Sequence, residues 1–231
     1  MQTLEAQAAS ITFGAWNFNP ATVTTSSSFA TGNGNATPMT LKALAEATAT
    51  ANPLSWGSDS ARTIVSLSNF FTVTPETGEK NGDTVRGVLS GRLEGVLGAS
   101  GQVIQVGSWE NFVLASVDAG GIESWRGGEG QVGFDSQIGT TVVNVNQAFN
   151  RQGILTIGEQ YAFNMRLEVT ASKTGVYQAF SNFIGDGQGL TVNIQIPTQP
   201  VPEPLTMLAS ATALGFGAFL KREHSKKPKK S

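Results

Sequence analysis

Apolar and polar residues alternate along much of the chain. The clearest case lies at residues 161–169, where one face carries five apolar residues: Tyr161, Phe163, Met165, Leu167 and Val169. The opposite face carries Asn164, Arg166 and Glu168. A period of two is typical of a strand with one buried face, because successive side chains point to opposite sides of a sheet. This segment is therefore predicted to be a half-buried antiparallel strand.

Similar runs recur through the body of the chain. They lie at residues 62–73, 84–97, 102–117, 140–149, 154–172, 176–185 and 190–196. Clusters of glycine, asparagine and aspartate separate several of them, as expected for tight turns. Short strands with turns, and no alternation of strands with helices, predict an all-β fold. We expect an antiparallel β-sandwich of jelly-roll type over residues 9–198.

Two segments depart from this pattern. Residues 37–50 begin with a threonine and a proline, a pair that suits a helix cap and first turn, and Leu41, Leu44 and Ala45 would line one side of that helix. A helix is therefore the first prediction here, although the threonines near its end also fit a strand. Residues 24–38 are rich in serine, threonine, glycine and asparagine, which predicts an exposed loop.

The strongest apolar run lies near the C-terminus, over residues 205–220, with Leu205 and Leu220 at its ends. As a helix it would be about 24 Å long, short of the roughly 30 Å hydrocarbon core of a bilayer. Lys221 and Arg222 follow directly and could reach the interface as a stop-transfer signal. The run predicts a C-terminal hydrophobic helix in a membrane, and a buried core helix is the alternative.

Val201, Pro202, Glu203 and Pro204 precede this run. The order of Pro-Glu-Pro, short apolar helix and basic pair resembles the PEP-CTERM sorting signal. That resemblance implies an exported bacterial protein whose tail is recognised and processed by an exosortase-type membrane enzyme, in organisms that export polysaccharide. The end of the body, residues 161–204, is similar to the ending of many cyanobacterial proteins of this kind. The alternative is a proline-rich linker leading to a plain membrane anchor.

Export also requires a signal peptide. Ala6-Gln7-Ala8 matches a small-x-small cleavage site, yet the residues before it carry neither a basic region nor an apolar core. We therefore expect residues 1–8 to be the remnant of a signal peptide whose start lies upstream. The expected organisation is residues 1–8 as this remnant, 9–198 as the sandwich, and 199–231 as the sorting and anchor segment.

Charge and composition narrow the classes of function. Nine basic and fourteen acidic side chains lie in residues 9–200, whereas six basic residues crowd into the last eleven positions. An acidic body with a separate basic tail argues against nucleic-acid binding. The chain has no cysteine, and its one histidine, His224, is in the tail. Thiolate chemistry, Cys-ligated zinc and Ser-His-Asp catalysis are therefore excluded from the body.

The remaining chemical signals are weak. Residues 128–133 match G-x-G-x-x-G, but a strand-like run follows them where a dinucleotide site needs a helix, so a flexible turn is expected. Asp186 between two glycines, near Asn182, also suits a turn. Structural calcium at such a loop is the alternative, and no other cofactor or metal is expected.

Carboxylates and tryptophans leave two routes to sugar chemistry. Glu110 and Glu123 each sit beside a tryptophan, and a carboxyl next to an apolar ring can act as a general acid in glycoside hydrolysis. The alternative is a surface glutamate beside a buried ring. The tryptophans could instead stack on sugars, although core packing is their commoner role. Trp125, in a glycine-rich stretch, is expected to be the most exposed and is the candidate glycan contact.

Together these observations predict a non-enzymatic, exported protein with a structural or interaction role. It would be membrane-anchored first, then released or attached to the cell surface or matrix. Its expected partners are the exosortase-type enzyme, the membrane and extracellular polysaccharide, with no nucleic acid. A carbohydrate-binding module is the first alternative, and a carboxylate-dependent glycan-active enzyme is the second.

Overall fold

The structure is a computed structural model of the chain, and it describes residues 9–26, 30–48, 58–101, 107–135, 139–174, 176 and 178–197. These residues form twelve strands and no helix. The strands are β1 (Ser10–Phe13), β2 (Asn17–Thr25), β3 (Ala30–Thr37), β4 (Thr40–Thr48), β5 (Ser58–Thr74), β6 (Thr84–Gly101), β7 (Gly107–Ala119), β8 (Trp125–Asp135), β9 (Gly139–Thr156), β10 (Gln160–Thr174), β11 (Gln178–Phe183) and β12 (Gly189–Gln195).

Contacts between residues gather Ala8–Pro197 into one compact unit. The expected signal remnant at residues 1–8 and the expected sorting segment at residues 199–231 lie outside the described residues, so both stay predictions. Within the described part of the chain, no helix suitable for crossing a membrane is found.

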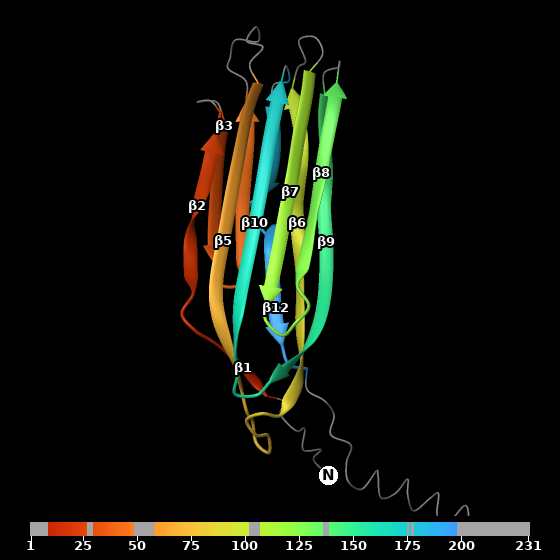
Figure 1. Cartoon of the computed structure of the whole chain (residues 1–231). Helices are drawn as coiled ribbons and strands as arrows, with labels where there is room; N and C mark the ends of the chain where they lie inside the picture. Colours follow the sequence, from red (N-terminus) through yellow and green to blue (C-terminus); the bar gives the residue numbers. More distant parts are fainter. Residues whose placement is uncertain are drawn as a thin grey trace, which may run out of the picture. The chain divides into compact units, whose positions relative to one another are not determined.

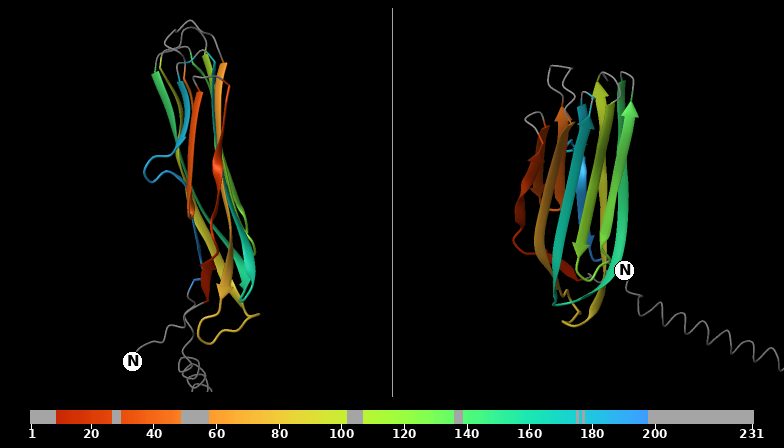
Figure 2. Two further views of the ribbon diagram at one scale, coloured as in Figure 1. Left: turned by 90° about the vertical axis from the view of Figure 1, so that its left-hand side faces the viewer. Right: turned by 45° about the horizontal axis from the view of Figure 1, so that its top comes forward.

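Two antiparallel six-stranded sheets lie face to face in this unit (Figures 1 and 2). Sheet A has the order β1-β5-β10-β7-β8, with β2 also paired to β5. Sheet B has the order β11-β4-β12-β6-β9, with β3 also paired to β4. In sheet B, β11 and β12 both pair with β4 and β6, so they occupy one strand position in succession. The all-β, two-sheet prediction is confirmed.

Strand β10 divides its side chains as its sequence predicts. Phe163, Met165, Leu167 and Val169 are buried between the sheets. Asn164 and Arg166 are exposed on the outer face of sheet A. The strand is paired along its length with β5 on one side and β7 on the other. It is therefore the central strand of sheet A, with a core face and a solvent face.

The core changes character along the strands. Towards the β4–β5 loop end it is rich in small residues, including Ala43, Ala45, Ala61 and Ala171. Three polar side chains here bond to backbone carbonyls of the facing sheet: Thr63 Oγ1 to Leu44 at 2.7 Å, Asn111 Nδ2 to Gly98 at 2.8 Å, and Ser181 Oγ to Thr170 at 2.5 Å. At the opposite end, aromatic rings including Phe71 and Phe163 fill the space. The small residues thus let the two sheets approach closely enough for side chains of one sheet to form hydrogen bonds with the backbone of the other.

Glycines in the strands make room for large side chains. A Cβ at Gly95 would collide with the ring of Phe183, and a Cβ at Gly91 would collide with the ring of Phe149. Gly127 and Gly133 make the same kind of room for the indoles of Trp125 and Trp109. These glycines serve close packing, as glycines within strands often do.

The flexible turn expected at residues 128–133 is wrong. This segment lies within β8 and is paired along its length with β7. The extended strand β9 follows it, in place of the helix that a dinucleotide site needs. Pairing with β7 outweighs the low strand propensity of glycine, together with ring packing over Gly127, just before the segment, and over Gly133, its last residue.

The helix expected at residues 37–50 is also wrong over its described part, because residues 37–48 form the end of β3, the turn and the second strand of the β3–β4 hairpin. The alanines at alternate positions of β4 are buried against the core, so a period of two decides the structure over the helix propensity of alanine. The loop expected at residues 24–38 is largely β3, whose Gly32 and Gly34 leave room for side chains of sheet A.

One ion pair lies inside the sandwich. Lys173 and Asp59 are opposite each other on β10 and β5, and Lys173 Nζ lies 3.0 Å from Asp59 Oδ2. The lysine side chain is only 2% exposed. A buried pair contributes little net stability, but loss of one partner leaves a charge in a region of low dielectric constant.

Asp59→Asn is expected to lower the free energy of unfolding by about 3–5 kcal/mol, because it leaves the buried Lys173 ammonium without the carboxylate that neutralises it. The double variant Asp59→Asn with Lys173→Met should recover most of that loss. Urea unfolding at pH 7 measures both. A single variant within about 0.5 kcal/mol of the wild type would contradict this account.

Gly95→Ala is expected to destabilise the protein by about 1–3 kcal/mol, because the new methyl group would displace the Phe183 ring. Gly130→Ala is the matched control, since a Cβ there meets only the Cβ of Phe112, at 3.8 Å. The control should leave stability unchanged or raise it slightly. Equal losses in the two variants would show that ring packing is not the reason for glycine at residue 95.

Candidate functional site

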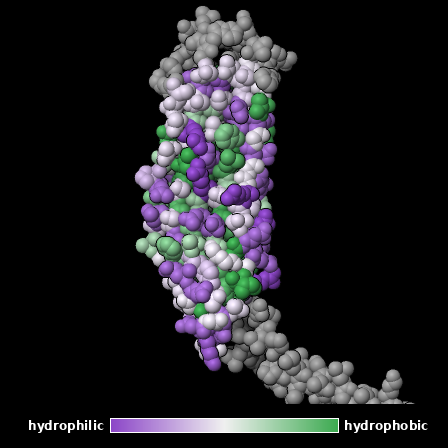
Figure 3. Space-filling view, viewed as in Figure 1, coloured by the Kyte–Doolittle hydropathy of each residue, from purple (hydrophilic) through white to green (hydrophobic). Residues whose placement is uncertain are grey.

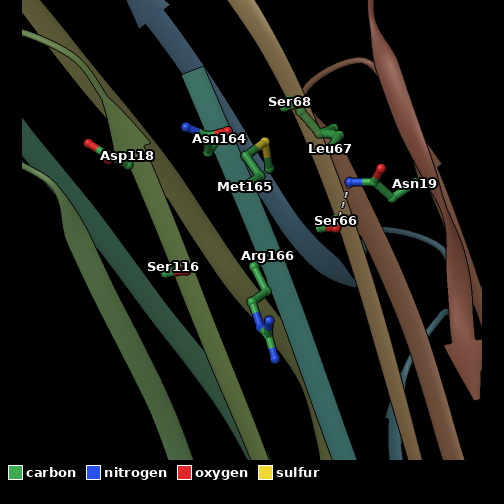
Figure 4. Close-up of a pocket in the computed structure, with 9 residues that line it drawn as sticks. All are labelled: Asn19, Ser66, Leu67, Ser68, Ser116, Asp118, Asn164, Met165 and Arg166. Carbon is green, nitrogen blue, oxygen red and sulfur yellow. Dashed lines mark hydrogen bonds between the residues drawn. The ribbon is translucent and has the colours of Figure 1, made fainter. Parts of the chain in front are cut away.

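The outer face of sheet A carries a shallow depression with a volume of about 380 Å³. We call it the polar groove. Its lining residues come from β2, β5, β7 and β10: Asn19, Ser66, Leu67, Ser68, Ser116, Asp118, Asn164, Met165 and Arg166. Figure 4 shows them side by side on four neighbouring strands.

Strand register aligns these residues in two rows. Arg166 on β10 lies opposite Ser66 on β5 and Ser116 on β7. In the next row, Asn164 lies opposite Ser68 and Asp118. Residues two apart on one strand share a face and are separated by about 7 Å, so the two rows are neighbours on the surface. The short side chains of Ser66, Ser68 and Ser116, beside Arg166 and Asn164, leave room for the depression.

Most polar atoms of the groove face solvent. Asn19 Nδ2 donates to Ser66 Oγ at 3.0 Å, which links β2 to β5 (Figure 4). The side chains of Ser68, Ser116 and Asn164 make no hydrogen bond to another described residue. Their hydroxyl and amide groups are therefore available to a ligand that brings donors and acceptors of its own.

A charged cluster borders the groove. The side-chain carboxylate of Glu168, which is 9% exposed, accepts hydrogen bonds from Arg62 Nε at 2.7 Å and from Arg166 Nη2 at 2.8 Å. Burial raises the pKa of this carboxyl, but the hydrogen bonds from Arg166 and Arg62 and their positive charges outweigh burial. Together they hold the pKa below its ordinary value. Both arginines therefore form hydrogen bonds within the outer face of sheet A.

Exposed apolar side chains are scattered around these polar groups. Phe70 on β5 is 55% exposed, and Leu114 on β7 is 54% exposed. In Figure 3, hydrophilic and hydrophobic residues are interspersed over this face and form no single continuous hydrophobic patch. Such a surface is unlike the apolar core of an obligate protein interface.

The structure corrects the expectation for Trp125. It is 5% exposed, begins β8, and stacks on Phe149 with ring centroids 4.1 Å apart and planes at 12°. The nearby glycines that suggested an exposed loop instead make room for its indole. Trp109 is also buried and Trp16 is partly buried, whereas Trp56 lies outside the described residues. The described tryptophans therefore serve packing.

The residues of the sorting signal lie outside the described residues. They are Val201, Pro202, Glu203, Pro204, Leu205, Leu220, Lys221 and Arg222. Their predicted roles are unchanged by the structure.

The two candidate acids are far apart. Glu110 is on β7 at the level of Val132, whereas Glu123 precedes β8, whose first residue is level with Val117. Glu110 and Val117 are seven positions apart on β7, which corresponds to about 23 Å along the strand. Glycosidase carboxylates lie within about 10 Å of each other, so these two glutamates do not form such a pair.

The loop around Asp186 is organised by a lysine. Lys42 Nζ donates to the carbonyl oxygens of Gly185 at 3.0 Å and Ile184 at 3.4 Å. Asn182 Oδ1 accepts from the Ile184 amide at 3.1 Å, which is the geometry of an Asx turn. The carbonyls that a calcium ion would need are thus bound to an ammonium group. Among the described residues, no three acidic or histidine side chains are grouped as a metal site.

The polar groove was missed by sequence reasoning. The pattern places Asn164 and Arg166 on the outer face of their strand, but not beside Ser66, Ser68 or Ser116. That neighbourhood depends on the pairing of β10 with β5 and β7, which are distant in sequence. A sequence signal exists only as short polar residues at alternate positions of the predicted strands.

Glu168→Gln is expected to lower stability at pH 7 by about 1 kcal/mol, because it removes the charge that the two half-exposed arginines share. A lowered folded-state pKa stabilises the protein above the ordinary value of 4.5, and this contribution is lost as pH falls through the folded-state pKa. The gap between wild type and variant should therefore close in acid. Urea unfolding from pH 7 to pH 3 measures it, with Asn164→Ala as a non-titrating control. A gap that is constant with pH would contradict the cluster's role.

A scan against family models, a search of curated proteins and a search of solved structures each found no match to the chain. The polar groove, the chemistry of the body and the pattern of the tail are therefore the features that bear on function.

Proposed function

We propose that the chain is an exported protein of the cell surface or extracellular matrix, with a structural or interaction role and no catalytic activity. One observation carries the proposal. It is the order of Val201-Pro202-Glu203-Pro204, the apolar run at residues 205–220, and Lys221-Arg222, which resembles a PEP-CTERM sorting signal. In this proposal an exosortase-type enzyme processes the tail after export.

The physical chemistry of the tail supports each step. Pro202 and Pro204 favour an extended backbone that a protease can bind next to the membrane, and Glu203 offers a charged contact. The apolar run forms a membrane helix in this proposal, and the basic pair retains the end on the cytoplasmic side. The compact unit ends at Pro197, shortly before the motif, so the motif follows the last strand closely.

The body supports an interaction role over catalysis. Its histidine-free sequence excludes the commonest general base, and the two acids considered for glycoside hydrolysis lie far apart. The polar groove offers binding groups on a surface held by continuous pairing of β5, β10 and β7. We also propose that the two antiparallel sheets form a sandwich of jelly-roll type.

Carbohydrate binding is the second candidate function. The observation that favours it is the groove's content of hydroxyl and amide groups turned to solvent, next to the exposed Phe70 ring. Polysaccharide is also the partner that the sorting-signal resemblance implies.

Glu203→Ala is expected to abolish processing of the tail, because it removes the charged residue of the motif. The full chain, with a secretion signal, would be expressed in a bacterium that has an exosortase, and its mass would be measured in the membrane and surface fractions. The wild type should lose a C-terminal fragment, whereas the variant stays full length in the membrane. Glu223→Ala is the matched control and should be processed. An unprocessed wild-type chain in the cytosol would contradict the proposal.

A further inference from the structure

The polar groove and its surroundings have the chemistry of one class of ligand. Sugar rings in pyranose form have apolar C–H faces and a rim of hydroxyl groups. A matching surface needs an accessible aromatic ring beside hydrogen-bonding groups that are not already satisfied within the protein.

Phe70 supplies the ring. It lies on the outer face of β5, two residues beyond Ser68, and is 55% exposed. Its partner across the pair on β10 is Ala162, and its carbonyl accepts from the amide of Gly14 at the sheet edge. Its neighbours on both sides, Ala162 and Gly14, are small, so the ring is accessible to solvent. An open phenyl face carries negative charge density that attracts C–H groups.

The groove supplies hydrogen-bonding groups in the row of residues next to Phe70. Ser68 and Asn164 are opposite each other in the row nearest to Phe70, with Asp118 beyond them on β7. Hydroxyl, amide and carboxylate groups together offer both donors and acceptors to vicinal sugar hydroxyls. Three strand spacings from β7 to β2 span about 14 Å, so more than one ring of a polymer fits across the strands.

The charged residues on this face favour an uncharged polysaccharide as the ligand. Arg62 and Arg166 both donate to Glu168, so the cations nearest the groove are already neutralised in part by a carboxylate of the same face. Asp118 at the far end of the second row would repel an anionic chain. An acidic polysaccharide would prefer a surface with unpaired cations.

We propose that the outer face of sheet A binds a neutral polysaccharide across its strands, with Phe70 stacked on one sugar ring and Ser68, Asn164 and Asp118 bonded to the hydroxyls beside it. This inference names the class of ligand for the interaction role proposed above, and it depends on that role. The site is built on the central strands of a packed sandwich, which hold these side chains in place before the ligand arrives.

Affinity electrophoresis of the purified full chain tests the proposal. The gels would contain hydroxyethyl cellulose, galactomannan or dextran as neutral probes, and alginate as the anionic probe. Migration should be retarded by at least one neutral polymer and not by alginate. Phe70→Ala and Asn164→Ala should each weaken the apparent affinity by about tenfold, the scale of losing one well-placed contact. Ile154→Ala changes a similarly exposed apolar residue on the outer face of sheet B, so it is the matched control and should bind as the wild type does.

Three results would overturn the inference: no retardation by any of the neutral polymers, retardation by alginate as strong as that by a neutral polymer, or retardation that Phe70→Ala and Asn164→Ala leave intact. The variants change exposed side chains, and urea unfolding would verify that they fold. Tail processing is measured separately by mass. If the chain is processed and reaches the surface but does not bind neutral glycans, only this inference is contradicted. If the chain binds glycans but stays unprocessed in the cytosol, only the proposed function is contradicted.

Discussion

The distance between the two sheets depends on how small and large residues interleave in the core. Alanines such as Ala45 and Ala171 allow close approach at one end, and side chains of Thr63 and Ser181 then reach carbonyls of the facing sheet. Elsewhere the Phe183 ring occupies the space that a side chain at Gly95 would fill. Protein interiors are packed nearly as densely as organic crystals, so each such fit constrains its neighbours. The order of glycine, alanine and aromatic residues along the strands is therefore what specifies this sandwich.

A consequence is that the outer face of sheet A is free for another task. The hydrophobic burial that stabilises β10 comes from its inward residues, of which Phe163 and Leu167 are fully buried. The outward residues contribute local hydrogen bonds and the cluster around Glu168. Surface substitutions away from such clusters usually change stability by less than about 0.5 kcal/mol. Short polar side chains can therefore be placed there without weakening the fold, and together they form the polar groove.

Much of the fold follows from the sequence, whereas the groove does not. The period of two in residues 161–169 predicts β10 and its buried face correctly, because burial on one side of a strand imposes that period. The same period in residues 40–48 was obscured by alanine, which is a good helix former and carries little hydrophobic contrast. The glycines around Trp125 predict an exposed position, but glycine is also the residue that allows an indole to pack against a strand. Residues of the groove are brought together by pairings between distant strands, and no local pattern encodes those pairings.

The central claim is that the main strands of sheet A stabilise the fold through their inward face, which leaves the outward face free for the proposed binding surface. Single alanine substitutions along β10, followed by urea unfolding, test this claim most directly. The account predicts losses of about 2–5 kcal/mol at Phe163, Met165 and Leu167, and changes below about 0.5 kcal/mol at Asn164. Losses at Asn164 as large as those at its inward neighbours would contradict it, because the outer face would then be part of the structural core.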